Sequence, residues 1–270
     1  MASKPLFTLQ IPNSSGTVIC TSPSDKIYLL TFTSPPDNRL LTPFCQTFLL
    51  ALDIIEFSYP RGVVITTSGI QKFYSNGLDL EHSSSTVGFF PNSLYALFKR
   101  LLTYPMPTVA LVNGHAFAGG FMVAMYHDYR IFNPSRGFLC LNELDLGVPL
   151  KPAMSSIFRQ KLAPHVYKAM VLEAKRFGAK EALEGGIVDA LGGMEELMKF
   201  IAEKKLSEKS KTGVYGRLKA EMFRETLGYL EGHETEEKRD KDNLKKDDKR
   251  REEGKKRVTD WEKNASKAKL

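Results

Sequence analysis

The sequence predicts an α/β fold, and three observations support this prediction. Short apolar runs rich in β-branched residues alternate, along the first half of the chain, with segments whose apolar residues recur at helical spacing. From about residue 163 onward the pattern is mainly helical. The chain has 270 residues, 42% of them hydrophobic, which is enough for one large core and an appendage. Strands that alternate with helices favour parallel pairing through right-handed crossovers.

The first expected strand covers residues 27–32 (IYLLTF), between Asp25 and the Pro35-Pro36 pair. A helix is expected next, because five apolar residues fall on roughly one helical face: Phe44, Phe48, Leu49, Leu52 and Ile55. Two further strands are expected at residues 63–66 (VVIT) and 108–112 (TVALV). Residues 132–141 predict two short extended pieces.

The later part of the chain predicts helices with few strands. Residues 179–183 and 187–191 flank Gly185-Gly186, a pair typical of a helix end and turn. Residues 195–206 and 215–230 each predict one helix. We therefore expect a catalytic core over residues 1–200 and a helical packing or oligomerisation region over 201–230.

Residues 231–270 form a highly charged tail. Of residues 231–260, 22 are charged, 11 acidic and 11 basic, so this stretch cannot bury a core. It is either a solvated helix held by pairs four residues apart or a disordered segment. The tail ends in Ala268-Lys269-Leu270, which resembles the Ser-Lys-Leu address read by the peroxisomal import receptor.

The bulk properties exclude several classes of protein. The formal net charge is +7, but no nucleic-acid recognition motif is present and the densest basic run is mixed with acids. No apolar run is long enough for a membrane span or a secretory signal. Three scattered cysteines, without metal-ligand spacing, predict neither a disulfide framework nor a metal site and favour a reducing compartment.

Two glycine-bearing segments lie between an expected strand and an expected helix. They are residues 68–80 (SGIQKFYSNGLDL) and 113–122 (NGHAFAGGFM). The start of a helix leaves backbone N–H groups unpaired, and glycine lets a ligand approach them. Two such groups that converge on one point form an oxyanion hole. Either segment alone is more often an ordinary strand-to-helix turn, because glycine turns are common. Neither is a phosphate loop, because the lysine and hydroxyl after the last glycine are missing.

Taken together in order, these segments resemble the crotonase superfamily of acyl-CoA enzymes, and in particular its monofunctional peroxisomal enoyl-CoA isomerases. The first segment is similar to the family's aromatic-to-Gly-x-Asp-Leu pattern, and NGHAFAGG is similar to its second glycine-rich run. Three later stretches also match: HDYRI at 127–131, NELDLG at 142–147, and AKEA with GIVD at 179–189. The resemblance covers about residues 27–191 and implies a ββα spiral core with a helical C-terminal region.

The resemblance also implies roles for individual residues. Leu78 and Gly119 would supply the two oxyanion-hole N–H groups, and Glu143 would be the catalytic base. Hydratases of the family carry a second glutamate three residues after the oxyanion-hole glycine, where this chain has Met122. A single carboxylate suits an isomerase, which moves one proton between two carbons of the substrate. The expected substrate-binding residues are Lys72, Phe73, Ser75, Asn76, Gly77, Asp79, Gly120 and Met122.

The expected reaction converts 3-enoyl-CoA to trans-2-enoyl-CoA in the β-oxidation of unsaturated fatty acids. The CoA thioester would be the substrate, with no metal and no separate cofactor. The family further implies a homotrimer or a dimer of trimers, here in the peroxisomal matrix. Alternatives are another crotonase reaction (dienoyl-CoA isomerisation or thioester hydrolysis), a non-catalytic acyl-CoA-binding homologue, and an interaction protein that acts through the charged tail.

Overall fold

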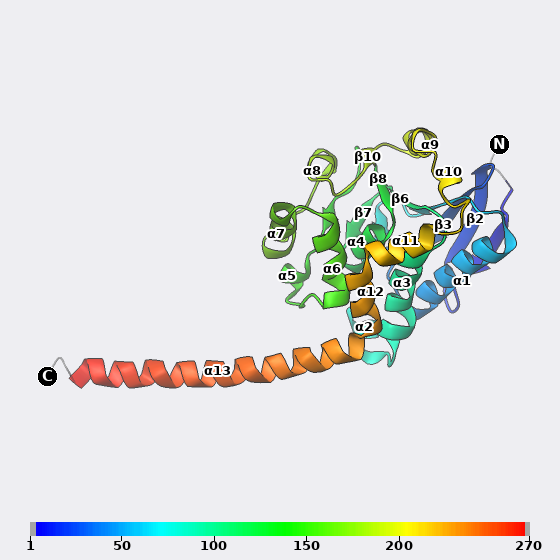
Figure 1. Ribbon diagram of the computed structural model, residues 1–270. Coiled ribbons are helices and arrows are strands. Elements are labelled where there is room, and N and C mark those ends of the chain that lie inside the picture. The colour runs from blue at the N-terminus through cyan, green and yellow to red at the C-terminus, as the bar shows by residue number, and fades with distance from the viewer. Residues whose placement is uncertain (1–3, 268–270) are drawn as a thin grey trace. The chain divides into compact units, whose positions relative to one another are not determined.

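A computed structural model describes residues 4–267 of the chain (Figure 1). Contacts within the chain divide it between Leu230 and Glu231 into two compact units. The first unit holds all the strands and the glycine-bearing segments. The described residues of the second unit lie mainly in one long helix.

A sheet of seven strands forms the centre of the first unit. Its strands, in spatial order, are β1 (Phe7–Gln10), β2 (Thr17–Ser24), β3 (Ile27–Thr33), β4 (Val63–Ser68), β6 (Thr108–Val112), β8 (Tyr129–Phe132) and β10 (Ala190–Leu191). The first three pair antiparallel, and all pairs from β3 to β10 are parallel. The strands expected at 27–32, 63–66 and 108–112 are confirmed as β3, β4 and β6.

A second, smaller sheet consists of three short parallel strands, and each of them is followed along the chain by a helix. It contains β5 (Phe73–Ser75), β7 (His115–Phe117) and β9 (Leu139–Cys140). Each strand follows one strand of the large sheet, in the order β4–β5, β6–β7 and β8–β9, and each pair leads into a helix. This repeat of two strands and a helix confirms the expected ββα spiral core.

Helices surround the two sheets (Figure 1). They are α1 (Thr42–Ser58), α2 (Leu80–Ser85), η1 (Phe90–Leu94), α3 (Tyr95–Thr103), α4 (Gly119–Tyr126), α5 (Glu143–Leu146), α6 (Pro152–Lys161), α7 (Pro164–Leu172), α8 (Ala179–Glu184), α9 (Met194–Glu203), α10 (Leu206–Lys209), α11 (Tyr215–Met222) and α12 (Arg224–Glu231). The helices expected around residues 44–55, 179–183 and 195–206 correspond to α1, α8 and α9.

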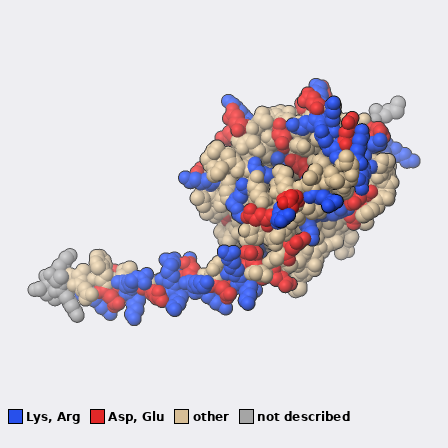
Figure 2. Space-filling model, in the orientation of Figure 1, with Lys and Arg blue, Asp and Glu red and all other residues tan. Residues whose placement is uncertain are grey.

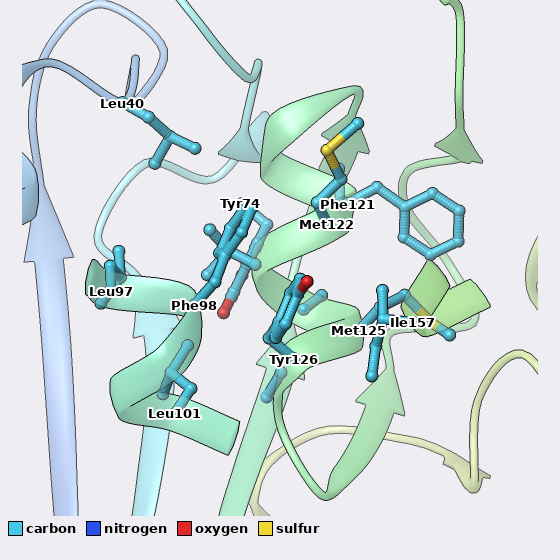
Figure 3. Packing of buried hydrophobic residues seen from close by; sticks show 14 of the residues in the cluster. Leu40, Tyr74, Leu97, Phe98, Leu101, Phe121, Met122, Met125, Tyr126 and Ile157 are labelled. Carbon is cyan, nitrogen blue, oxygen red and sulfur yellow. The ribbon is translucent and has the colours of Figure 1, made fainter. Parts of the chain in front are cut away.

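Helix α4 occupies the middle of the core, and every one of its residues is buried. A helix that is apolar on all sides is typical of a buried position, and the sequence GGFMVAMY fits the position that α4 occupies. Figure 3 shows Phe98 of α3 and Tyr126 of α4 facing each other, and their rings stack with centroids 4.2 Å apart. This packing fixes the axis of α4, and therefore the position of its first residue, Gly119.

Two boundaries differ from the sequence prediction. Residues 215–230 form two helices, α11 and α12, because the backbone leaves the helical region at Phe223 (φ −113°, ψ 29°). The turn lets the buried Phe223 ring pack against Lys161, whose Nζ lies 5.0 Å from the ring centroid. The first of the two extended pieces was expected to begin at residue 132. The strand at this place, β8, covers Tyr129–Phe132 and so ends where the piece was expected to begin.

The charged segment forms one helix of 35 residues, α13 (His233–Lys267). Of the two alternatives left open by its composition, the helix is the one the structure adopts. Pairs three or four residues apart include Lys245–Asp242 and Arg251–Asp247, and Figure 2 shows basic and acidic residues interleaved along it. Within residues 4–267, no helix has the length and apolar character needed to cross a membrane.

The division after Leu230 places residues 201–230 in the same compact unit as the core. Their expected role in packing between subunits stays a prediction. The tripeptide Ala268-Lys269-Leu270 lies outside the described residues.

Candidate active site

A cavity of about 420 Å³ lies where the two glycine-bearing segments meet α5. Most of its lining side chains are apolar. The lining residues are Arg39, Asn76, Leu78, Leu80, Ser83, Phe90, Ala118, Gly119, Met122, Asn142, Glu143, Leu146, Val148, Pro149, Lys151 and Met154. The structure thus brings the three expected catalytic positions, Leu78, Gly119 and Glu143, to one cavity.

Glu143 is the only carboxylate among the residues that line this cavity. It is 8% exposed, and its Oε2 atom has no hydrogen-bond partner among the described residues. Burial disfavours the charged form and raises the pKa of Glu143 from its ordinary value of 4.5 to about 7. A carboxylate with such a pKa can both take up and release a proton near neutral pH.

The position of Glu143 follows from a tight local turn. Glu143 is the first residue of α5, a single turn that ends at Gly147 in the left-handed conformation (φ 66°). The Val148 amide donates back to the Glu143 carbonyl at 3.0 Å, which closes the turn. Asp145, two residues along, is exposed and lies outside the cavity lining.

The two segments that carry the expected oxyanion-hole donors lie against each other. Gly77 has a positive φ of 84°, and a Cβ atom at this position would lie 3.0 Å from the Gly119 nitrogen and 2.8 Å from the Phe117 oxygen. Glycine is therefore required at position 77 for both its conformation and its close contact. Leu78 follows directly and lines the same cavity as Gly119.

The Gly119 amide points out of the start of a helix. Ala118 accepts the first hydrogen bond of α4, from the Met122 amide at 3.0 Å. Since the N–H groups of the first turn have no partner within the helix, the Gly119 N–H remains available to a ligand, and the helix dipole favours negative charge there. Ala118 has a positive φ of 46°, a strained conformation that places this amide at the edge of the cavity.

Close packing explains the glycine pair at the start of α4. A Cβ on Gly119 would lie 3.2 Å from Leu78 Cγ and 3.3 Å from Leu40 Cδ1. A Cβ on Gly120 would lie 2.3 Å from the backbone oxygen of Ser75, a distance that real side chains do not adopt. Gly119 therefore keeps the cavity open, and Gly120 lets α4 rest on β5 (Phe73–Ser75).

Met122 and Asn76 are the expected substrate-binding residues that line the cavity. Met122 is 1% exposed, and Figure 3 shows its side chain extending from α4. An apolar thioether thus occupies the position where hydratases of the resembled family carry a glutamate.

The other expected substrate-binding residues lie outside the lining of this cavity. Ser75 supports the loop, because its Oγ accepts from the Gly77 amide at 3.2 Å. Asp79 caps α2 by accepting from the His82 amide at 2.8 Å. The Lys72 ammonium lies 5.3 Å from the centroid of the Phe73 ring. A role for these residues, and for Gly77 and Gly120, in contacting substrate stays a prediction.

Sequence reasoning did not identify Arg39 and Asn142 as site residues. Asn142 lines the cavity next to Glu143, and its buried Oδ1 has no partner among the described residues. Arg39 reaches the cavity from the loop before α1, more than thirty residues before the segment it contacts. No sequence spacing indicates such a contact. The described part of the chain contains no cluster of three or more side chains suited to binding a metal ion.

Comparisons with known proteins agree with this fold. The family model described as enoyl-CoA hydratase/isomerase matches residues 23–264. The peroxisomal enoyl-CoA delta isomerase 2 of Arabidopsis thaliana is 31% identical over 220 residues, which cover 76% of this chain and 91% of the relative. The peroxisomal enoyl-CoA delta isomerase 1 of the same plant is 32% identical over 213 residues, covering 75% and 88%.

Among solved structures, human mitochondrial delta3-delta2-enoyl-CoA isomerase shares the fold. Its TM-score is 0.72 at 23% identity, and the match covers 81% of this chain and 88% of the human one. The fold and the cavity together define a crotonase-type protein. The chain belongs to the enoyl-CoA hydratase/isomerase family, and its likeness to the plant isomerases supports an enzyme of that type.

Proposed function

We propose that this protein is an enoyl-CoA isomerase that converts 3-enoyl-CoA to trans-2-enoyl-CoA. One observation carries the proposal: a single buried carboxylate, Glu143, without a hydrogen-bond partner on Oε2, lines an apolar cavity together with Leu78 and Gly119. One base and one pair of backbone donors suffice for an intramolecular shift of a double bond.

In the proposed reaction the thioester oxygen of the substrate lies between the Leu78 and Gly119 amides. The Glu143 carboxylate removes a proton from the α carbon, and the electron pair moves into the conjugated system, which places negative charge on the thioester oxygen. The two N–H groups stabilise this dienolate. In other enzymes the loss of one such donor costs about 2.7–4 kcal/mol of transition-state stabilisation.

The proton then returns to the γ carbon. The electron pair moves back, the double bond forms between the α and β carbons, and Glu143 regains its charge. A pKa of about 7 suits both steps, because the carboxylate is basic enough to accept the proton and acidic enough to release it. The proton that leaves the α carbon is the one delivered to the γ carbon, so no co-reactant is needed.

The cavity lining favours isomerisation over its rivals within the family. Met122 cannot activate a water molecule, whereas hydration in the family uses two carboxylates. Dienoyl-CoA isomerases use a further aspartate about eight residues after the glutamate. In that region this cavity is lined by Lys151, and Asp145, an exposed acid in the same turn as Glu143, does not line it.

Product analysis tests the proposal. The purified protein is incubated with 3-enoyl-CoA esters of several chain lengths, and products are separated by chromatography. We expect 2-enoyl-CoA as the first product. Predominant 3-hydroxyacyl-CoA would indicate a hydratase, and free CoA a thioesterase. Binding of the esters without any product would leave the non-catalytic homologue.

The interaction-protein alternative is tested by deleting residues 233–267. If the protein acts through its charged helix, the deletion abolishes its function while any isomerase chemistry persists. The proposal predicts instead that turnover of 3-enoyl-CoA is the function, and that it depends on the residues of the first unit.

We further propose the peroxisomal matrix as the location, where the reaction would serve β-oxidation of unsaturated fatty acids. Two relatives are named as peroxisomal in Arabidopsis thaliana, which supports this location. A fluorescent fusion with and without Ala268-Lys269-Leu270 tests the role of that tripeptide as a ligand of the import receptor. Sedimentation analysis tests the proposed homotrimer or dimer of trimers.

A further inference from the structure

Three successive carbonyl groups of the loop at residues 76–78 are all bound by one other segment. Arg39 Nη1 donates to the Leu78 oxygen at 2.8 Å and to the Asn76 oxygen at 3.3 Å. The Leu40 amide donates to the Gly77 oxygen, between them, at 2.9 Å. The segment around Arg39 therefore binds every carbonyl of the loop that carries the first oxyanion-hole donor.

These bonds determine where the Leu78 N–H points. The Gly77 carbonyl and the Leu78 N–H belong to the same planar trans peptide, so they point in opposite directions. Because the Leu40 amide holds the carbonyl on one side, the Leu78 N–H is directed to the other side, away from Leu40. Leu78 lines the cavity and Leu40 does not. The bonds to Asn76 and Leu78 prevent the flanking peptides from rotating and keep this peptide plane fixed.

A second set of contacts holds Arg39 itself. Its Nε donates to Asp37 Oδ2 at 3.1 Å, and the Asn76 side-chain amide donates to the same oxygen at 2.6 Å. The backbone amide of Asn76 also donates to the Asp37 carbonyl at 3.0 Å. A planar guanidinium can bind two carbonyls and a carboxylate at once in a fixed geometry, whereas a lysine ammonium binds as a point charge on a flexible stem.

We propose that Arg39 is a positioning residue of the oxyanion hole: it fixes the loop 76–78 so that the Leu78 amide is preorganised toward the thioester oxygen. This inference rests on the oxyanion hole of the proposed function. Preorganised donors stabilise developing charge without reorganisation, so a loosened loop lowers the rate of the chemical step more than the affinity for substrate.

The expected effect is a loss of turnover with binding retained. Arg39→Met keeps the length of the aliphatic stem but removes every donor. We expect kcat to fall by about 10- to 100-fold, since small misplacements of catalytic groups have effects of that order, while KM changes by less than about threefold. Arg39→Lys should recover only part of the activity. The control is Arg61→Met, because Arg61 is an exposed arginine that lies outside the cavity lining.

The direct readout is the absorbance of a bound chromophoric thioester, a cinnamoyl-CoA derivative, in the Glu143→Gln background, where turnover is expected to be strongly reduced. Donors at the thioester oxygen polarise the conjugated system and move its absorption to longer wavelength. We expect the wild-type loop to give this shift, Arg39→Met to reduce it strongly, and Arg61→Met to leave it unchanged. Added guanidinium ion should restore part of the shift in Arg39→Gly.

Three results would overturn the inference. A full spectral shift in Arg39→Met would show that the loop is positioned without the arginine. A loss confined to KM, which disappears with a pantetheine thioester that lacks the nucleotide, would make Arg39 a CoA ligand instead. Absence of the spectral shift in the protein with Arg39 intact would overturn the oxyanion hole and this inference together. If only the isomerase assay fails, the spectral test still decides whether Arg39 positions the loop.

Discussion

Replacing Glu143 by glutamine should make the protein more stable, and increasingly so as the pH rises. Burial raises the pKa of Glu143 from 4.5 to about 7, so the folded state binds its proton more tightly than the unfolded state does. The stability that the protonated form contributes is complete below pH 4.5 and is lost as the pH rises through about 7. Above that value the folded protein holds a charged carboxylate in an apolar cavity.

The size of the effect follows from the two pKa values. Each pH unit between them corresponds to about 1.4 kcal/mol, so the full penalty of the ionised carboxylate is about 3 kcal/mol. Glutamine is neutral at every pH and avoids it. Between pH 5 and pH 8 the difference in unfolding free energy between Glu143→Gln and the wild type should therefore grow by about 2 to 3 kcal/mol in favour of the variant.

Urea unfolding at pH 5, 6, 7 and 8, followed by circular dichroism, measures this difference. Asp145→Asn is the matched control, because Asp145 is an exposed carboxylate of the same short helix, α5. Stability curves of wild type and Glu143→Gln that run parallel from pH 5 to pH 8 would refute the argument that burial perturbs this carboxylate.

Three further predictions concern activity. The kcat/KM for 3-enoyl-CoA should rise with pH through about 7 and then level off, because the base must be ionised; a rate independent of pH between 5.5 and 8.5 would contradict this. Gly119→Ala should lower kcat by about 10- to 100-fold, since its Cβ would press on Leu78 Cγ at 3.2 Å, and unchanged kinetics would show that the hole tolerates the methyl group. Met122→Glu should yield some 3-hydroxyacyl-CoA from 2-enoyl-CoA, because it supplies the second carboxylate of a hydratase; a folded variant with no hydratase product would argue against the role assigned to this position.

The sequence predicted the strands of the large sheet best where burial is complete. Residues 63–66 and 108–112 are short runs of β-branched residues, and β4 and β6 are buried throughout. Of the small sheet, only β9 falls within a predicted extended piece, the second one of residues 132–141. The strands β5 and β7 were not predicted, because three residues each are too few to show a period. The hairpin of β1 and β2 was also missed, since β2 (Thr17–Ser24) contains many polar residues and a proline.

The candidate site was predictable only in part, because some of its residues come together only in the folded chain and leave no local sequence pattern. Glu143, Leu78 and Gly119 lie in segments whose order along the chain resembles the family, and the structure places all three at one cavity. Arg39 and Asn142 contribute through their position in the fold. A hydrogen bond between Arg39 and the Leu78 carbonyl joins two loops that only the pairing of the folded chain brings together, so no local pattern indicates it.

The most direct test of the central claim is to compare wild type and Glu143→Gln with 3-enoyl-CoA, measuring both turnover and binding. The appearance of conjugated 2-enoyl-CoA is followed by absorbance, and binding of a saturated acyl-CoA is measured by calorimetry. A single-base mechanism predicts that kcat falls by roughly 100-fold or more in the variant while the Kd for the acyl-CoA changes little. Turnover in Glu143→Gln equal to that of the wild type would contradict the claim that Glu143 transfers the proton.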